Sequence, residues 1–254
     1  MQTATLTLIG GPTVLIEVAG FRLLTDPTFD MPGEYQLPHV TLRKTSAPSL
    51  SPNEVGSVDA VLLSHDQHAD NLDTAGRAFV RDAPRVLTTI AGAARLGGRS
   101  EGMAPWTETT MMKAGRRLVI IATPARHGPA GIEPLAGDVI GFILRWDDAD
   151  GIYVTGDTVW FEGTAEVARR FSPRLVVLFA GAAKTRGAFH LTMNTNDALE
   201  TAHAFPSATI VPVHCEGWAH FSESRGDLEK AFEALGVRPR LNGLEPAVAA
   251  EVQL

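Results

Sequence analysis

Side chains that could hold a metal ion follow four separate stretches of apolar, strand-like sequence. These side chains are His65, His127, Asp157 and His214. Imidazole nitrogens and carboxylate oxygens are the ligands that zinc and similar divalent cations take. Because strand ends open onto loops held by a rigid scaffold, side chains there can be directed at a common point. The sequence therefore predicts a divalent metal site where these strands end.

The first of these strand ends carries a dense cluster, Ser-His-Asp-Gln-His-Ala-Asp-Asn at residues 64–71. Within it, His65, His68 and Asp70 fall inside six residues. Burying an unpaired charge or imidazole is costly, whereas a shared cation compensates all three together. The alternative is that they are unrelated polar loop residues, and we favour the metal. A bound divalent ion lowers the pKa of its water from 15.7 towards ~7, which indicates hydrolysis at neutral pH.

The elements that must position these side chains are short strands, followed by strands that alternate with helices. The chain opens with three strands joined by tight turns, which indicates an antiparallel meander. Residues 26–52 contain five prolines and little periodicity, which is typical of a long surface loop. A helix that follows Asn194 or Thr195 would be capped by one of them. The predicted strands are 3–9, 13–18, 21–25, 58–63, 85–89, 117–123, 139–146, 151–155, 175–179 and 209–213, and the predicted helices are 72–80, 90–96, 164–171, 196–205 and 222–235.

The composition limits the classes of partner. The 254 residues include 22 basic and 29 acidic side chains, so the net charge is −7. A mildly acidic chain without a basic stripe is a poor nucleic-acid binder. No apolar run approaches the ~20 residues that span a bilayer, and the N-terminus lacks the features of a signal peptide.

The same composition also suggests how the chain is organised and where it works. No repeat or linker divides residues 1–254, which predicts one domain. A single cysteine, Cys215, suits a reducing compartment, so we expect a cytoplasmic protein. We expect a small-molecule substrate and no nucleic-acid or membrane partner, and a homo-oligomer is compatible with the sequence.

Several segments resemble a known family. Residues 64–73 are similar to the metal-binding signature of the metallo-β-lactamase superfamily, His-x-His-x-Asp-His followed by Leu-Asp. The later order of a His, an Asp and a His at strand ends matches the rest of that pattern. Leu-Leu-Thr-Asp-Pro at residues 23–27 and His-Leu-Thr-Met at residues 190–193 resemble the UlaG-like branch, which is the branch of the ascorbate-6-phosphate lactonases.

This resemblance implies a fold and a ligand set. The fold is α/β, a four-layer αββα sandwich, with the metal site at one edge between the two sheets. The implied metals are one or two zinc ions, with manganese or iron as alternatives. The implied ligands are His65, His68 and His127 for the first ion and Asp70, His214 and the bridging Asp157 for the second.

The cluster departs from the family signature in two ways. One extra residue separates its histidines, so alignment from either end puts Asp66 or Gln67 in a histidine position. We favour a small bulge that retains both His65 and His68. Asn71 replaces the last histidine, and an amide oxygen is a weaker zinc ligand that suits harder metals. Asn71 is therefore a ligand or a cap, and the second position is weak, filled by manganese or iron, or empty.

A site of this kind suits hydrolysis of a small-molecule lactone or phosphoester. Asp70 or Asp157 would orient the water and take its proton. His190 or His220 would contact the substrate or protonate the leaving group. A phosphodiesterase or nuclease of the same fold is the first alternative, and a non-catalytic metal-binding protein with a degenerate site is the second.

The remaining polar residues near the cluster receive supporting roles. Asp66 and Asp73 are candidates for hydrogen bonds to ligand imidazoles. Asp26 precedes a proline and is interpreted as a turn former. Cys215 is interpreted as a small buried hydrophobic residue rather than as half of a Cys–His pair.

Overall fold

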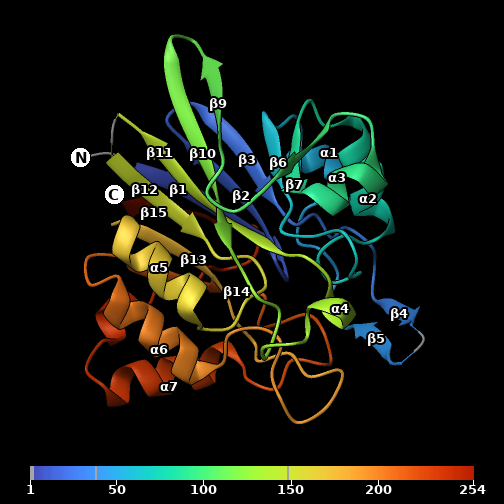
Figure 1. The fold of residues 1–254 in the computed structure, drawn as a ribbon, viewed down its shortest axis with the longest axis vertical. Coiled ribbons are helices and arrows are strands. Elements are labelled where there is room, and N and C mark those ends of the chain that lie inside the picture. The colour runs from blue at the N-terminus through green and yellow to red at the C-terminus, as the bar shows by residue number, and fades with distance from the viewer. Residues whose placement is uncertain (1–2, 38, 148) are drawn as a thin grey trace.

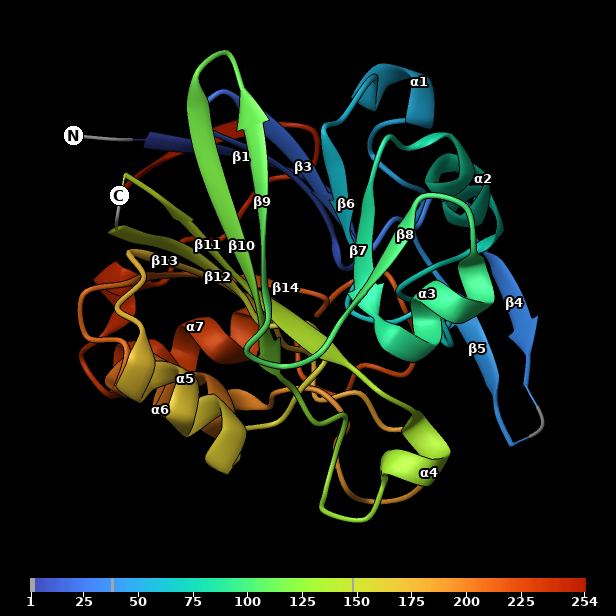
Figure 2. The same ribbon diagram turned by 45° about the horizontal axis from the view of Figure 1, so that its top comes forward.

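The computed structural model describes residues 3–37, 39–147 and 149–254. Two β-sheets pack face to face, and helices cover the outer face of each sheet (Figure 1 and Figure 2). This is the four-layer αββα sandwich that the family resemblance implies. The helices beside the first sheet are α1 (Pro52–Val55), α2 (Thr74–Asp82) and α3 (Ile90–Leu96), and those beside the second are α5 (Glu162–Arg170), α6 (Thr195–Ala204) and α7 (Arg225–Ala234).

The first sheet has seven strands in the order β15-β1-β2-β3-β6-β7-β8. Strands β1 to β3 form the antiparallel meander expected from the sequence, and β3, β6, β7 and β8 run parallel. The strand bounds are Thr3–Gly10 (β1), Thr13–Val18 (β2), Phe21–Thr25 (β3), Ala60–Leu62 (β6), Val86–Thr89 (β7), Ser100–Met103 (β8) and Ala249–Gln253 (β15).

The second sheet has six strands in the order β14-β13-β12-β11-β10-β9. Strand β11 is antiparallel to both of its neighbours, and β12, β13 and β14 are parallel, so β10 runs in the same direction as these three. The bounds are Glu108–Lys113 (β9), Arg116–Pro124 (β10), Ile140–Trp146 (β11), Ala149–Val154 (β12), Leu175–Phe179 (β13) and Thr209–Val213 (β14).

Strand β10 of the second sheet is packed on both of its faces. Its residues Leu118, Ile120 and Ala122 pack into the core between the two sheets. The alternating residues Val119 and Ile121 pack into a second core under the helices. A strand buried on both faces reads as a continuous apolar run, which is why its position was evident from the sequence. Because β10 is packed on both faces, its carboxyl end, which precedes His127, has a fixed position at the edge of the sheet.

Residues 26–52 correct the sequence prediction of a loop. The segment contains a hairpin of β4 (Gly33–Gln36) and β5 (Thr41–Lys44), which projects from the sandwich in Figure 2. The hairpin was missed because its strands, Gly-Glu-Tyr-Gln and Thr-Leu-Arg-Lys, are short and mostly polar. Pro38, one of the prolines on which the prediction rested, lies outside the described residues.

Other differences fall on short or exposed elements. Strands β8, β9 and β15 and the short helix α4 (Glu133–Ala136) were not predicted. Helix α7 begins three residues later than expected, because the backbone amides of Ser222 and Glu223 donate to the Gly181 carbonyl instead of entering the helix. At the start of α6, Asn194 is the cap, since its side chain accepts from the Asp197 amide.

Candidate metal centre

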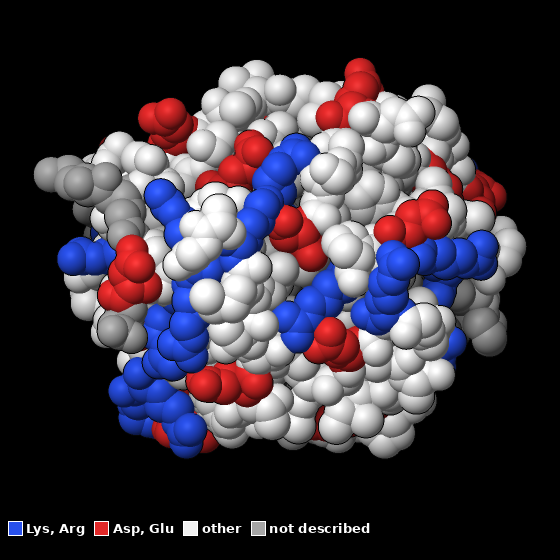
Figure 3. Space-filling view, turned by 90° about the horizontal axis from the view of Figure 1, so that it is seen from above, with Lys and Arg blue, Asp and Glu red and all other residues white. Residues whose placement is uncertain are grey.

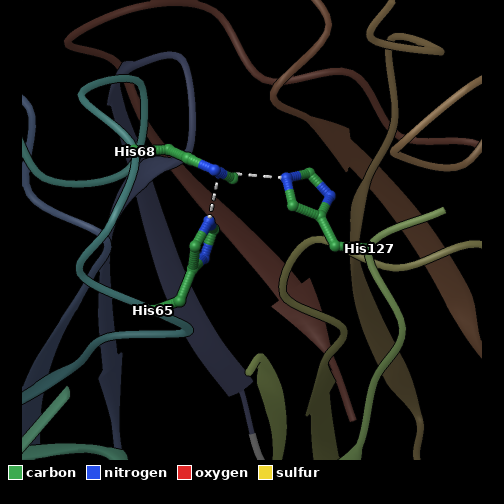
Figure 4. A group of neighbouring side chains, drawn as sticks. All are labelled: His65, His68 and His127. Atoms are coloured by element: carbon green, nitrogen blue, oxygen red, sulfur yellow. Dashed lines mark hydrogen bonds between the residues drawn. The ribbon is translucent and has the colours of Figure 1, made fainter. Parts of the chain in front are cut away.

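Three imidazoles converge just beyond the ends of β6 and β10. Nδ1 of His68 lies 2.9 Å from Nε2 of His65 and 3.1 Å from Nε2 of His127 (Figure 4). His65 and His127 are buried, and His68 is half-buried. A tetrahedral zinc ion with Zn–N bonds of 2.0–2.1 Å separates its ligand nitrogens by about 3.3 Å. The spacing of the three nitrogens is therefore close to that of one ion's ligands.

The cluster retains both histidines despite the extra residue. The chain turns directly after them, since the amides of Asn71 and Leu72 both donate to the His68 carbonyl. The ligand nitrogens of His65 and His68 lie in one group with that of His127. The bulged register is therefore the observed one, and neither Asp66 nor Gln67 takes a histidine position.

Hydrogen bonds behind the imidazoles decide which ring nitrogens carry protons. Nδ1 of His127 lies 2.8 Å from the Leu191 carbonyl, which can only accept, so the proton sits on Nδ1. The Ser64 hydroxyl donates to Asp26 Oδ1 at 2.6 Å and so accepts from Nδ1 of His65 at 2.9 Å. Both Nε2 atoms consequently present lone pairs towards His68. One His68 proton can satisfy only one of them, whereas a cation accepts both.

A second group lies beside the histidines. The ligand atoms of Asp70, Asp157 and His214 all lie within 4.8 Å of one another, and all three residues are buried. Nδ1 of His214 is 2.9 Å from Asp157 Oδ1, and Nε2 is 3.6 Å from Asp70 Oδ2. Neither oxygen of Asp157 and neither nitrogen of His214 has a well-directed hydrogen bond. Buried polar atoms without such partners fit a site for a cation.

Asp157 connects the two groups. Its Oδ1 lies against His214, and its Oδ2 lies 3.5 Å from Nε2 of His127. The two oxygens of this one carboxylate therefore face different groups, which is the geometry that a bridging ligand needs.

The two groups have opposite electrostatics. Burial lowers the pKa of His65 well below its usual range and that of His68 to about 4. Burial also lowers the pKa of His214, but the carboxylates of Asp157 and Asp70 outweigh it and raise that pKa to about 10. Burial raises the pKa of both carboxyls, and the neighbouring imidazoles outweigh it, so both pKa values lie well below the usual range. Without a metal, His65 and His68 are therefore neutral at pH 7, whereas the acidic group is ionic.

Two residues of the site adopt backbone conformations that are rare outside glycine. His214 has φ of 56° and Asp26 has φ of 30°. Each is held by a backbone hydrogen bond, from the His214 amide to the Gly11 carbonyl and from the Asp26 amide to the Leu62 carbonyl. Strain of this kind persists where surrounding structure enforces it and is frequent at functional sites.

Asp26 corrects a sequence prediction. It is fully buried rather than a surface turn residue, and it accepts both the amide and the hydroxyl of Ser64. It therefore supports His65 through Ser64. The only available signal was its place at the end of a predicted strand, which the family resemblance brought near the site.

Asp66 and Asp73 were predicted to form hydrogen bonds to ligand imidazoles, but they bind other groups. Asp66 pairs with Arg95 at 2.9 Å, beside helix α3. Asp73 caps α2 through the Gly76 amide and binds Lys44 of the hairpin at 3.0 Å. Both carboxylates therefore hold elements in place and do not orient ligands.

The two other histidines predicted to act in catalysis, His190 and His220, differ in their position relative to the cavity. His190 lies 3.0 Å from Asp197 on the first turn of α6 and is not among the residues lining the cavity over the histidines. Its position does not support the catalytic role expected for it. His220 lines that cavity, and its Nε2 lies 2.9 Å from Asp70 Oδ2. Asn71 is buried, with Nδ2 3.4 Å from Asp26 Oδ1 and with no partner for its own Oδ1.

A small, partly open cavity lies above the two groups. Its floor contains His68, Asp70, His127 and His220. Its walls come from the β4–β5 hairpin, from α4 and from the segment before α6. The wall residues are Leu37, His39, Val40, Leu42, Ala136, Ala183, Thr185, Arg186 and Leu191.

Comparison with known proteins identifies the family. Residues 21–215, more than half of the chain, match the family described as "Beta-lactamase superfamily domain". The chain belongs to this superfamily. A "UPF0173 metal-dependent hydrolase" from Pelotomaculum thermopropionicum is 31% identical over 185 residues, which cover 69% of this chain and 75% of the relative. This superfamily member is therefore a metal-dependent hydrolase of the UPF0173 family.

Two further relatives match almost the whole length of the hydrolase. The "UPF0173 protein YddR" of Bacillus subtilis is 25% identical over 239 residues, covering 91% of this chain and 93% of the relative. The crystal structure of an isothiocyanate hydrolase from Delia radicum gut bacteria superposes with a TM-score of 0.82 at 26% identity, covering 97% of this chain and 98% of that one.

Among the helices of the described residues, none has the length and apolar character to cross a membrane.

Proposed function

We propose that this hydrolase uses two adjacent metal positions to activate water for attack on a small lactone or phosphoester. Zinc is the proposed metal, because imidazole and carboxylate ligands suit it, with manganese or iron as alternatives. The proposed ligands are His65, His68 and His127 for one position and Asp70, His214 and the bridging Asp157 for the other, with Asn71 as a further candidate.

The observation that carries this proposal is the pair of lone pairs at Nε2 of His65 and His127. Their tautomers follow from the Ser64 and Leu191 hydrogen bonds, and they meet at a single His68 nitrogen. Such an arrangement is unfavourable in a purely structural cluster, because two acceptors then share one donor. A bound cation removes the conflict.

The protein's own groups would then carry the proton and orient the substrate. A bound divalent ion supplies a Lewis acid and a water of lowered pKa. Asp70 and Asp157, both buried and ionised, would orient that water and accept its proton at a carboxylate oxygen. The cavity walls would exclude bulk water and hold the substrate over these carboxylates.

The cavity walls favour an uncharged substrate. Six of the wall residues are aliphatic, which suits the ring of a lactone better than a phosphate group. The resemblance to the UlaG-like branch also points to a lactone, and the isothiocyanate hydrolase suggests isothiocyanates as a further class to assay. Arg186, the one Lys or Arg side chain among the described residues of that lining, keeps phosphoesters in the assay panel.

Two alternative functions receive less support. On the face shown in Figure 3, acidic side chains lie beside the basic ones. Ion pairs of the described residues, such as Lys113 with Asp59 and Arg85 with Glu101, neutralise part of the basic charge. This pattern and the net charge of −7 disfavour a nucleic-acid phosphodiesterase. A non-catalytic metal-binding role is disfavoured because the ligands line an open cavity, as catalytic sites require.

Assays of metal-loaded protein on lactones, phosphoesters and isothiocyanates test the proposal. We expect hydrolysis of at least one class that falls about 100-fold or more after chelation and returns with zinc. The His127→Ala variant serves as the inactive reference and His203→Gln, an exposed histidine on α6, as the active control. Absence of bound metal, together with equal activity of wild type and His127→Ala, would overturn the proposal.

A further inference from the structure

A fourth side chain, that of His220, contacts Asp70 of the acidic group and lies outside the metal-binding signature at residues 64–73. We propose that His220, rather than Asn71, completes the second metal position, so that a divalent cation there binds Asp70, Asp157, His214 and His220. This inference rests on the proposed function, because it concerns the same metal centre. It replaces the missing histidine of the signature with one from a distant part of the chain.

The first argument is the orientation of Asn71. Its Nδ2 lies 3.4 Å from Asp26 Oδ1, so the amide faces the Asp26–Ser64 pair behind His65. Asp26 is fully buried there, with Oδ2 also lacking a partner. Asn71 therefore has a role as a donor to a buried carboxylate, which is separate from binding metal.

The second argument is the environment of Asp70 Oδ2. Nε2 of His220 lies 2.9 Å from this oxygen, and Nε2 of His214 lies 3.6 Å from it. The oxygen thus has an imidazole Nε2 on two sides. A cation that binds Asp70 through this oxygen would be within reach of both imidazoles.

The third argument is that, among the described residues, the His220 side chain forms a hydrogen bond to Asp70 and to no other polar group. Its Nδ1 is buried without a hydrogen bond, and its ring packs against Phe221 with centroids 4.7 Å apart. A buried imidazole that bonds only to a carboxylate of the metal group is difficult to explain as a purely structural residue. It is explained if Nε2 is a ligand.

The backbone around His220 is fixed before any metal binds. The Ala219 amide donates to the Arg43 carbonyl of β5, and the His220 carbonyl accepts from the Lys184 amide, each at 3.0 Å. Trp218 is buried and bridges to Lys44 on the same hairpin. The imidazole is therefore held at the site by two segments that also form the cavity walls.

The donor set has a chemical consequence. With Asn71, the second position would consist of two carboxylates, one amide and one imidazole, a set that favours hard metals. With His220 it has two carboxylates and two imidazoles, which zinc and iron bind well. The inference therefore predicts that the protein binds two zinc ions rather than one.

Metal stoichiometry and competition with a chelator test this inference without relying on activity. Protein freed of metal is titrated with zinc alone, and bound metal is measured by mass spectrometry. We expect wild type, Asn71→Ala and the exposed control His203→Ala to bind two equivalents. In His220→Ala, the dissociation constant of one equivalent should rise 10- to 100-fold or more, with the other unchanged.

Each contrary outcome is distinct. Wild type that binds one equivalent, or an Asn71→Ala variant that loses the second ion while His220→Ala keeps it, overturns the inference but leaves the proposed hydrolase intact. Wild type that binds no metal overturns both. Two bound ions without any hydrolysis overturn only the proposed function. If His220→Ala does not fold, His220→Gln takes its place, with circular dichroism of the metal-free protein as the check.

Discussion

The two halves of the metal centre are built on different principles. In the histidine half, each outer imidazole is held from behind by a protein hydrogen bond, at the Leu191 carbonyl and at the Ser64 hydroxyl. In the acidic half, the ligand groups hold one another, because Asp157 and Asp70 surround His214. The first half is therefore preorganised by its surroundings, whereas the second is organised by its own charges.

This difference indicates how each half behaves without metal. In the histidine half, two Nε2 acceptors share one His68 proton, so a bound cation stabilises this half more than the other. The acidic half is partly compensated by the protonated His214, since the neighbouring carboxylates raise its pKa to about 10. A metal must displace that proton. We therefore expect the first ion to bind at the histidines and the second to bind more weakly.

The largest expected effect comes from removing one imidazole of the histidine half. His127→Ala deletes an Nε2 donor and should lower kcat/KM by about 1,000-fold, or about 4 kcal/mol, through loss of the first ion. The measurement is steady-state kinetics with bound metal quantified in parallel. His190→Ala is the matched control, because His190 pairs with Asp197 outside the cavity, and it should retain activity within about threefold. Equal losses in the two variants would contradict the separation of these histidines.

Asp157→Asn tests whether one carboxylate couples the two halves. The amide keeps the shape but removes the charge that faces both His214 and His127. We expect kcat/KM to fall about 100-fold and the pKa of His214 in metal-free protein to fall, because a carboxylate that raises it is gone. NMR titration of the imidazole follows the second effect. An unchanged His214 titration would show that Asp70 alone sets its charge.

Lowering the pH should reduce the free energy of unfolding of the metal-free protein, because His65 and His68 must then take up protons. The folded pKa of His68, about 4, lies below the unfolded value of 6.5, so its contribution is present above pH 6.5 and is lost as the pH falls towards 4. We expect the free energy of unfolding to drop by about 2 kcal/mol between pH 7 and pH 4.5, with His65 adding in the same direction.

His214 opposes this change only in part. Its raised pKa keeps it protonated in the folded protein throughout that range, whereas the unfolded imidazole takes up its proton around pH 6.5, so the stabilisation from His214 grows mainly between pH 7 and pH 6 and then stays constant. Urea denaturation of chelated protein gives the free energies, and His68→Gln is the variant in which the pH slope should flatten. A pH-independent stability of the metal-free wild type would contradict the lowered pKa values of His65 and His68.

The smallest effect is expected from the support behind His65. Ser64→Ala removes the acceptor of the Nδ1 proton and should weaken first-ion binding about 10-fold, or about 1.4 kcal/mol. Chelator competition measures it. Ser49→Ala is the matched control, since the Ser49 hydroxyl donates to the Leu8 carbonyl in the first sheet. A Ser64→Ala protein with unchanged affinity would mean that the surrounding backbone alone orients His65.

Much of the fold could be predicted because its strands are apolar on one or both faces. β10 and β13 are apolar runs between two cores, and the meander alternates regularly. The β4–β5 hairpin could not be predicted, because its polar strands are held by contacts distant in sequence, such as Lys44 with Asp73. The same holds for the edge strands β9 and β15, whose residues are largely exposed.

For the site, the sequence alone determined that six imidazoles and carboxylates stand at strand ends in the order of a known metal-binding pattern. Only the tertiary structure decided how they are grouped, that His65 and His68 both face the centre, and that Asp26 supports while His190 does not. It also brought His220 to Asp70 across 150 positions. The physical reason is that the sequence fixes the type of each donor and the local spacing between donors. The tautomer, the charge and the partners of each imidazole depend instead on atoms from other strands and loops.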